Sequence, residues 1–435
     1  MKIIIIGGNP GGMSAAARLM RKGKDVEVVV FEKTNEVSYG ACGLPYYIGG
    51  ENNDIDKMRI RKAPEFIDSG VDLRLYHEAL SVDADAKTVT VKNLKTGEVH
   101  TEGYDKLIVA TGAASIRPPL PGASKAFALK TLEDGERIKE AAKLAKRAVI
   151  VGGGYIGLEL AEAFRRLCID LTVIEAQDRV LPGFDPEFSK IAQEALIRGG
   201  VDVKCGERVE EIGDDFVATD RGRYPTELTV LSVGVRPATG IFAGAAPEML
   251  KNGAIVTNEY METSLPDVYA AGDCATVWHA VLNKPVYLPL GTNANKQGRV
   301  LADRIAGSGK PLPGALGSAM LRCFDRELAR TGVTEAEAAA AGLNFGAVTV
   351  EAGSHARYYP GSVKLTVKLV YDKSSKVLLG AQMAGEKECA LRIDTLTVAI
   401  DRKMTARELA FCDLAYAPPF ASVWDAVQQA AGVIK

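Results

Sequence analysis

A single cysteine, Cys42, lies in the segment SYGACGLP (38–45), shortly after a glycine-rich loop. The chain has seven cysteines, but none of them form a pair with C-x-x-C or C-x4-C spacing. One thiol cannot form an internal disulfide, so Cys42 can cycle only against an external sulfur or through an oxidised single-sulfur state. A lone cysteine is more often a small buried hydrophobic residue. The surrounding glycines and proline, together with the nearby loop, favour a redox role.

Two stretches of the chain share one order of elements: strand, glycine turn, helix, strand and acidic residue. The first is predicted as a strand over 2–6, the loop GGNPGG (7–12), a helix to about Arg21 and a strand over 26–31 before Glu32. The second is a strand over 148–151, the loop GGGYIG (152–157), a helix to about Leu167 and a strand over 171–174 before Glu175. We interpret the pair as two dinucleotide-binding units.

The spacing within each unit explains the chemistry. Glycines permit a tight turn and the close approach of a pyrophosphate, and the helix start supplies free N–H groups. The acidic residue follows the first glycine by 25 and 23 positions, close to the expected ~20, and accepts hydrogen bonds from a ribose. The second loop is a complete G-x-G-x-x-G, whereas the first has Asn9 at the middle glycine.

Three further segments, LIVATG (107–112), VYAAGD (268–273) and PLGTNANKQGR (289–299), complete the pattern. In this order they resemble two-dinucleotide-binding flavoprotein reductases. The resemblance implies FAD at the first loop, with candidate residues Gly7, Gly11, Gly12, Glu32, Lys33, Thr111, Gly112, Gly272, Asp273 and Ala294. It implies NAD(P)H at the second, with candidate residues Gly152, Gly154, Ile156, Gly157, Glu159, Glu175 and Gly234.

The nicotinamide cofactor is predicted to be NADH. The Glu175 carboxylate can accept from a ribose 2′-hydroxyl and would repel a 2′-phosphate. NADPH stays possible because Arg179 lies nearby and can soften this repulsion.

The predicted fold class is α/β, with two Rossmann-like dinucleotide-binding domains of the glutathione-reductase-like kind and a C-terminal α+β dimerisation domain. We place the FAD-binding domain at 1–112 and 245–315, the NAD(P)H-binding domain at 113–244 and the dimerisation domain at 316–435. In the last domain we expect strands over 348–350, 363–371 and 377–383 and helices over 394–401 and 422–431.

Three sites point to a smaller group within this class of reductases: Cys42, HARYYPG (355–361) and YAPPFAS (416–422). Disulfide reductases of the glutathione-reductase kind have a second cysteine where this chain has Val37. The chain is instead similar to the single-cysteine branch: coenzyme A disulfide reductases, NADH-dependent persulfide or polysulfide reductases, and NADH oxidases and peroxidases. In coenzyme A disulfide reductases two tyrosines come from the partner subunit. Carried over, they are Tyr359 and Tyr416, which implies a homodimer with catalytic residues Cys42, Tyr359 and Tyr416.

Peroxidases and water-forming oxidases of this branch carry a histidine in the first glycine loop, where this chain has Pro10. Proline cannot transfer protons, and Pro10 therefore argues against reduction of peroxide or oxygen as the main activity. Two alternatives stay open: an NADH oxidase that forms hydrogen peroxide, and a thiol redox sensor without catalytic turnover.

The expected substrate is coenzyme A disulfide or a coenzyme A persulfide or polysulfide. Positions matching the substrate contacts of this branch, or lying beside them, are Ser14, Arg18, Arg21, Lys22, Ser38, Asn295 and Trp424. The basic residues among them also fit an ordinary solvated helix face. Trp424 stands where the branch often has a lysine, so the identity of the thiol is open. Because a thiolate is the attacking species, we expect a helix start or nearby cations to lower the pKa of Cys42.

Composition adds weak limits. With 435 residues and a net charge of −2, the chain has no overall attraction to nucleic acid or acidic membranes. The N-terminal run MKIIII is too short for a signal peptide, and no apolar run reaches the ~18 residues of a membrane helix. We therefore expect a cytoplasmic protein with no membrane or nucleic-acid partner, and we predict no metal site.

Overall fold

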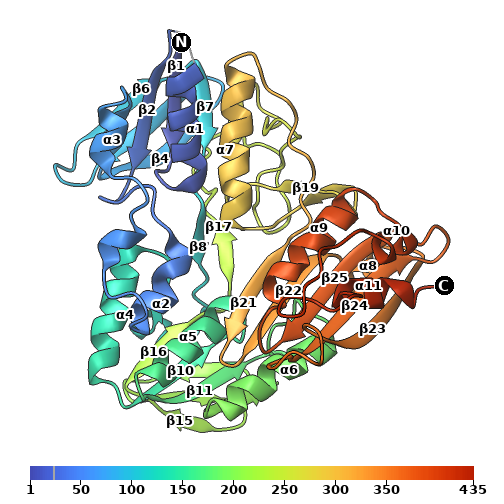
Figure 1. Cartoon of the computed structure of the whole chain (residues 1–435). Helices are drawn as coiled ribbons and strands as arrows, with labels where there is room; N and C mark the ends of the chain where they lie inside the picture. Colours follow the sequence, from blue (N-terminus) through green and yellow to red (C-terminus); the bar gives the residue numbers. More distant parts are fainter. Residues whose placement is uncertain (23–24) are drawn as a thin grey trace.

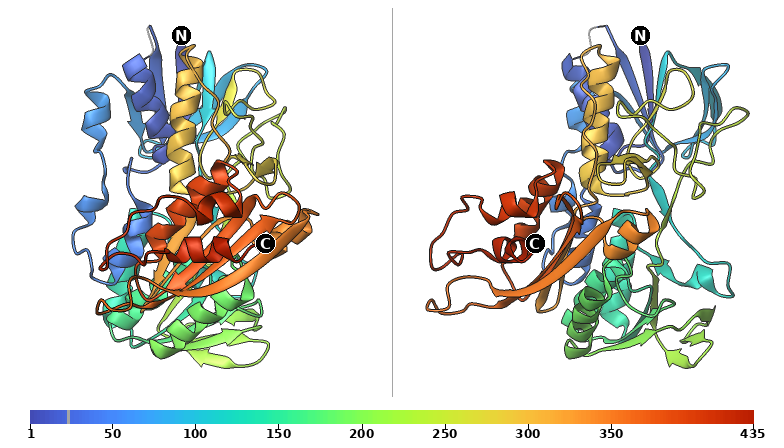
Figure 2. Two further views of the ribbon diagram at one scale, coloured as in Figure 1. Left: turned by 45° about the vertical axis from the view of Figure 1, so that its right-hand side comes forward. Right: turned by 90° about the vertical axis from the view of Figure 1, so that its right-hand side faces the viewer.

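The computed structural model describes residues 1–22 and 25–435 as three modules around separate sheets (Figure 1). Two modules form a column, and the C-terminal module projects to one side of it (Figure 2). The predicted α/β class is confirmed by the two parallel sheets with helices packed against them.

The first sheet has the order β18-β7-β1-β2-β3 and is parallel throughout. Its strands are β1 (Lys2–Ile6), β2 (Glu27–Glu32), β3 (Asp72–Leu75), β7 (Lys106–Val109) and β18 (Val268–Ala270). Strands from two distant parts of the chain thus complete one sheet. Helices α1 (Pro10–Lys22) and α7 (Gly291–Ile305) lie side by side, and a Cβ at Gly298 would meet the Gly11 carbonyl oxygen at 2.3 Å. An antiparallel sheet of β4 (His77–Asp83), β5 (Thr88–Asn93) and β6 (Val99–Gly103) packs against the same module.

The second parallel sheet, β12-β11-β10-β16-β9, repeats this design. Its strands are β9 (Phe127–Ala128), β10 (Arg147–Val151), β11 (Asp170–Glu175), β12 (Val201–Cys205) and β16 (Leu228–Leu231). The helices of this module are α4 (Leu132–Leu144), α5 (Tyr155–Arg166) and α6 (Pro186–Arg198). Strands β8 (Ala113–Ser115) and β17 (Val235–Pro237) pair with each other where the chain enters and leaves the module.

The C-terminal sheet is antiparallel, in the order β21-β22-β25-β24-β23. Its strands are β21 (Ala319–Cys323), β22 (Arg326–Gly332), β23 (Phe345–Gly353), β24 (Lys364–Asp372) and β25 (Leu378–Gly385). Its helices are α8 (Glu335–Ala340), α9 (Ile393–Asp401), α10 (Ala406–Ala410) and α11 (Ala426–Gly432). The prediction of a helix from 422 was wrong at its start, because Asp425 caps α11 by accepting from the Val427 N–H.

Smaller elements fill the connections: α2 (Leu44–Ile48), α3 (Ala63–Ile67), β13 (Val209–Ile212), β14 (Phe216–Thr219), β15 (Arg223–Pro225), β19 (Val277–His279) and β20 (Lys284–Val286). Short 3-10 turns include Ala41–Gly43 and Ala390–Arg392. No helix in the described parts of the chain is both long and apolar enough to cross a membrane.

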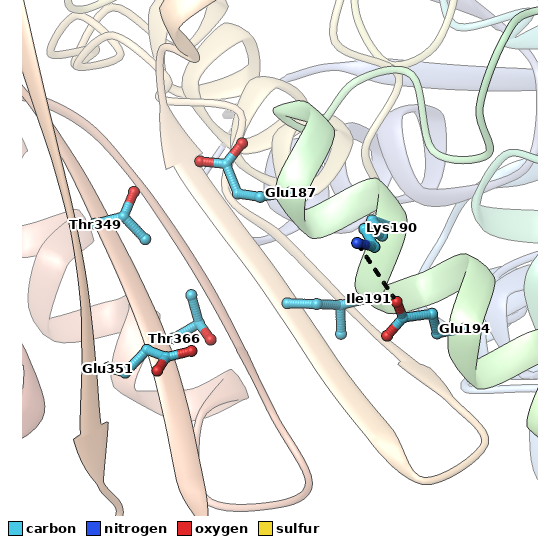
Figure 3. Close-up of a pocket in the computed structure, with 7 residues that line it drawn as sticks. All are labelled: Glu187, Lys190, Ile191, Glu194, Thr349, Glu351 and Thr366. Carbon is cyan, nitrogen blue, oxygen red and sulfur yellow. Dashed lines mark ion pairs between the residues drawn. The ribbon is translucent and has the colours of Figure 1, made fainter.

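A buried lysine joins the second and third modules. Lys368 on β24 contacts Asp185 at 3.0 Å, Glu187 at 2.6 Å and Glu335, and the side chains of Lys368 and Asp185 are only 4% and 3% exposed. Beside it, α6 and strands β23 and β24 border an open groove of about 670 Å³ lined by Glu187, Lys190, Ile191, Glu194, Thr349, Glu351 and Thr366 (Figure 3). None of these lining residues is a predicted site residue.

Candidate functional site

The two glycine loops match in atomic detail. Gly7 and Gly152 have φ of +109° and +108°, a conformation that favours glycine. The Gly8 N–H donates to Glu32 Oε2 at 2.7 Å, and the Gly153 N–H donates to Glu175 Oε2 at 2.7 Å. The repeated units are therefore equivalent in geometry as well as in spacing.

Space and donors at both loops fit a dinucleotide. A Cβ added at Gly112 or Gly154 would meet no atom within 4 Å, so both positions border open space. Gly154 precedes helix α5 and offers no side-chain cap, which leaves the first N–H groups of the helix free for a pyrophosphate. The buried Thr111 hydroxyl has no hydrogen-bond partner among the described residues. These features fit FAD beside the first loop and NAD beside the second.

The other predicted cofactor residues surround the same loops. Gly12 and Gly157 cannot carry a Cβ, which would lie 2.0 and 2.1 Å from the Gly7 and Gly152 carbonyl oxygens. Ala294 lies 3.6 Å from the Cβ position of Gly272, whose N–H donates to Gln297. Gly234 has φ of +103°. Lys33 is exposed beyond β2, and Ile156 is 38% exposed in the first turn of α5.

Asn9 performs a task that the sequence did not suggest. Its Oδ1 accepts from the Tyr39 N–H at 3.1 Å, and the Ser38 N–H donates to the Gly8 carbonyl at 2.9 Å. The residue that breaks the glycine pattern thus fixes the segment before Cys42 to the first loop. The predicted substrate residue Ser38 is held there with φ of +51°.

Cys42 lies exposed in the 3-10 turn Ala41–Gly43, which leads into α2. Desolvation by the surrounding protein atoms raises the pKa of its thiol above its ordinary value, the carboxylates of Glu159 and Asp273 raise it further, and Lys130 opposes them. The expected lowering of the pKa was wrong, because desolvation of the thiol and two acidic groups from remote segments outweigh one cation. Lys130 is moreover paired with Asp273 at 2.9 Å.

Glu159 links the second glycine unit to Cys42. It lies on α5, and Tyr46 Oη donates to its Oε1 at 3.3 Å. Burial raises the pKa of Glu159 to about 7. The residue predicted to bind NAD therefore also belongs to the charged surroundings of the thiol, together with Tyr46 four residues after Cys42.

The predicted coenzyme A contacts on α1 are already engaged. Arg18 forms a two-pronged ion pair with Asp303 of α7 at 2.7 and 2.9 Å, and Lys22 lies 3.3 Å from the same carboxylate. Ser14 Oγ donates to Asn295 Oδ1 at 2.7 Å. The structure therefore brings four of the predicted positions together on the α1–α7 face, but a phosphate there would compete with Asp303. Arg21 is exposed.

The predicted tyrosines lie on loops of the C-terminal module. Tyr416 shares a hydrogen bond with Tyr358 Oη, which was not predicted, whereas the ring of Tyr359 packs against His355 with centroids 5.7 Å apart. Trp424 packs edge-on against Phe411 at 6.0 Å, and both are exposed. Among the described residues, no hydrogen bond or ion pair joins these loops to the Cys42 segment, and the loops project away from the column (Figure 2).

Comparison with known proteins agrees with this class of fold and site. Residues 1–298 match the model for the pyridine nucleotide-disulphide oxidoreductase family, and residues 320–427 match its dimerisation domain. The chain belongs to the pyridine nucleotide-disulphide oxidoreductases, which are FAD- and NAD(P)H-dependent enzymes.

The named activities of similar proteins differ from one protein to another. The chain is 36% identical to the NAD(P)H coenzyme A polysulfide/persulfide reductase of Pyrococcus horikoshii, over 100% of this chain and 98% of the relative. It superposes on reduced CoADR-RHD of Bacillus anthracis with a TM-score of 0.96 and 33% identity, covering 100% of this chain and 80% of the other. The water-forming NADH oxidase of Lactobacillus brevis bound to NADH gives a TM-score of 0.96 at 32% identity, with 99% and 97% coverage.

Proposed function

We propose that this protein uses NADH to reduce the disulfide or the persulfide and polysulfide forms of coenzyme A through the single thiol of Cys42. The observation that carries the proposal is the place of Cys42. Its segment is fixed to the first dinucleotide loop through Asn9, and its thiol is under the influence of Glu159 from the second unit. A thiol with no cysteine at the C-x4-C spacing cannot form an internal disulfide, and an external sulfur is the partner that this proposal gives it.

When bound, FAD supplies the passage of two electrons from NADH to sulfur. The Cys42 thiolate attacks one sulfur of a coenzyme A disulfide, which forms a mixed disulfide and expels coenzyme A thiolate. Two electrons and a proton then break the mixed disulfide and release the second coenzyme A with the Cys42 thiolate restored. With coenzyme A persulfide, the thiolate attacks the outer sulfur, breaks the S–S bond of the substrate and expels coenzyme A thiolate, which leaves a persulfide on Cys42. Two electrons then break the S–S bond of this Cys42 persulfide and release hydrosulfide with the Cys42 thiolate restored.

Two observations support coenzyme A as the thiol that carries the substrate sulfur. The α1–α7 face presents Ser14 and Asn295 beside Arg18 and Lys22, where phosphates can exchange with the Asp303 carboxylate. The named activity of the Pyrococcus relative also concerns coenzyme A.

The partner subunit completes the site in this proposal. The Tyr358–Tyr416 pair is exposed, and neither residue contacts Cys42 of its own chain through a described hydrogen bond. In a two-fold dimer through the C-terminal module, Tyr416 can donate a proton to the leaving sulfur of the partner's substrate.

The deciding experiment compares NADH consumption with coenzyme A disulfide, coenzyme A persulfide, inorganic polysulfide and oxygen alone. Intact-protein mass gives an independent reading, because a coenzyme A adduct lost after Cys42→Ser identifies the thiol partner. Oxygen consumption that equals NADH consumption under all conditions would favour the NADH oxidase alternative and overturn the proposal.

A further inference from the structure

We infer that Arg392 is a positioning residue whose guanidinium holds two tyrosine-bearing loops, 354–361 and 412–425, in the arrangement that completes the partner's Cys42 site. This inference rests on the proposed function only for the consequence in catalysis. The contacts of Arg392 with the two loops, called the Arg392 clamp below, do not depend on the proposed function.

Arg392 ends the 3-10 turn before α9 and reaches both loops. Its Nη2 donates to the carbonyl oxygens of Ser354 at 2.7 Å and Phe420 at 2.8 Å, which belong to one loop each. Its Nε donates to Asp425 Oδ2 at 3.1 Å, and its Nη1 donates to the Glu388 carbonyl. One guanidinium thus bridges the segments that carry Tyr358 and Tyr416.

The charge of Arg392 is well placed for this task. Its side chain is 16% exposed and that of Asp425 is 11% exposed, so the pair is largely shielded from water. The Asp425 carboxylate also caps α11 through the Val427 N–H at 3.1 Å. Only arginine offers five donors in a planar fork, so lysine cannot satisfy the same four acceptors.

Glu388 anchors the first loop from another side. Its carboxylate lies 3.3 Å from His355 Nδ1, and His355 Nε2 lies 3.3 Å from the Pro360 carbonyl. The ring of His355 in turn packs against Tyr359. The backbone carbonyl of Glu388 accepts from Arg392, while its side chain contacts loop 354–361. Both tyrosine-bearing loops are therefore attached to the same short segment before α9.

The tyrosines themselves have little other support. Tyr358, Tyr359 and Tyr416 are 74%, 43% and 42% exposed. Apart from the Tyr358–Tyr416 hydrogen bond, Arg392 provides the polar link between the two loops within the described residues. Loss of the guanidinium should therefore free the tyrosines without disturbing either dinucleotide loop.

The first test uses Arg392→Gln and Arg392→Lys, with Arg402→Gln as the control because Arg402 is 77% exposed. We expect Arg392→Gln to lower kcat with coenzyme A disulfide or polysulfide at least tenfold, with NADH-driven flavin bleaching, the KM for NADH and dimer mass unchanged. Arg392→Lys should retain part of kcat, because it keeps the charge beside Asp425. Wild-type turnover in Arg392→Gln would overturn the inference. If Arg392→Gln does not fold, a full wild-type kcat in Arg392→Lys would overturn it instead.

The second test places the loops in trans. Heterodimers of one Cys42→Ser chain and one Arg392→Gln chain, purified with two different tags, should regain about half of wild-type activity. They contain one site with an intact thiol and intact partner loops. Loss of activity in Arg392→Gln without this complementation would overturn the role across the interface.

A third reading does not depend on the substrate. Limited proteolysis of the dimer should cut Arg392→Gln faster than wild type within 354–361 or 412–425 and at equal rates elsewhere. Unchanged cleavage would overturn the clamp. If wild-type protein reduces none of the sulfur substrates, the proposed function fails, whereas the proteolysis result still decides on Arg392.

Discussion

The hydroxyl groups of Tyr358 and Tyr416 share a hydrogen bond, although 58 positions separate them in the chain. This contact raises the pKa of the Tyr416 hydroxyl above its ordinary value. The structure thus pairs Tyr416 with Tyr358, whereas the predicted site residue Tyr359 packs against His355.

Removal of the Tyr416 hydroxyl should therefore impair disulfide turnover. We expect Tyr416→Phe to lower kcat about a hundredfold, within the usual contribution of a positioned proton donor. Tyr358→Phe should lower it about tenfold, because Tyr416 keeps its hydroxyl but loses its partner. Steady-state turnover with coenzyme A disulfide measures both, and a wild-type rate in Tyr416→Phe would remove this residue from the mechanism.

Cys42→Ser separates flavin reduction from sulfur chemistry. A serine hydroxyl is a weak nucleophile without an adjacent base, so sulfur turnover should fall by orders of magnitude. FAD should still bind, and NADH should still bleach the flavin in stopped-flow, because the glycine loops, Glu32 and Asp273 are untouched. Retention of wild-type turnover would show that the central assignment is wrong.

Glu159→Gln should make the Cys42 thiol more acidic. Above about pH 7 the wild-type Glu159 is charged, and this charge raises the pKa of Cys42. Removing it should shift the midpoint of Cys42 alkylation by iodoacetamide to lower pH, whereas Glu162→Gln serves as the control on the same helix. A midpoint that does not move would refute the coupling.

The same carboxyl predicts how stability varies with pH. Because the folded protein keeps the Glu159 proton up to about pH 7, whereas the unfolded chain releases it near 4.5, the free energy of unfolding should fall as pH rises through this interval. Glu159→Gln should flatten that part of the pH–Tm curve.

Coenzyme choice should follow Glu175. Both of its carboxylate oxygens accept backbone N–H groups, from Gly153 at 2.7 Å and Gln177 at 2.8 Å, so the negative charge is fixed at the end of β11. We expect a higher kcat/KM for NADH than for NADPH. Glu175→Gln should reduce this preference about tenfold, which corresponds to about 1.4 kcal/mol. A wild-type enzyme that favours NADPH would contradict this reading of the loop.

Lys368→Ala tests the junction of the second and third modules. It leaves the buried Asp185 without its cation, which typically costs about 3 kcal/mol or more. Lys190→Ala is the matched control, since Lys190 lines the adjacent groove and is 77% exposed (Figure 3). Thermal unfolding should show a clearly lower Tm for Lys368→Ala and little change for the control.

The sequence predicted the parts of this structure that depend on local order. Each glycine unit, with its helix and its terminal glutamate, follows from residues within a single βαβ stretch. Within such a stretch the spacing along the sequence determines which residues come into contact. The predicted strand over 348–350 was too short, because β23 runs from Phe345 to Gly353 and is paired with β24 along that length. Partly exposed strands of this kind lack a continuous apolar signal.

Contacts between distant segments were not predictable in this way. The pKa of Cys42 is raised first by desolvation and then by Glu159 and Asp273, which no local pattern places beside it. Asn9 interrupts the glycine motif, and its role was not predictable because its partner, the Tyr39 N–H, lies 30 positions further along the chain. Arg392 belongs to no motif, since three of its four acceptors are backbone carbonyls on separate segments and the fourth is the Asp425 carboxylate.

The divided first sheet has a consequence for synthesis on the ribosome. Strand β18 pairs with β7 through Val268 and Leu107, so this sheet stays one strand short until residue 270 has emerged. All five strands of the second sheet lie between residues 127 and 231 and can associate earlier. Domains generally fold as units as they emerge. The module that the chain begins first is thus the one that it completes after the module inserted within it.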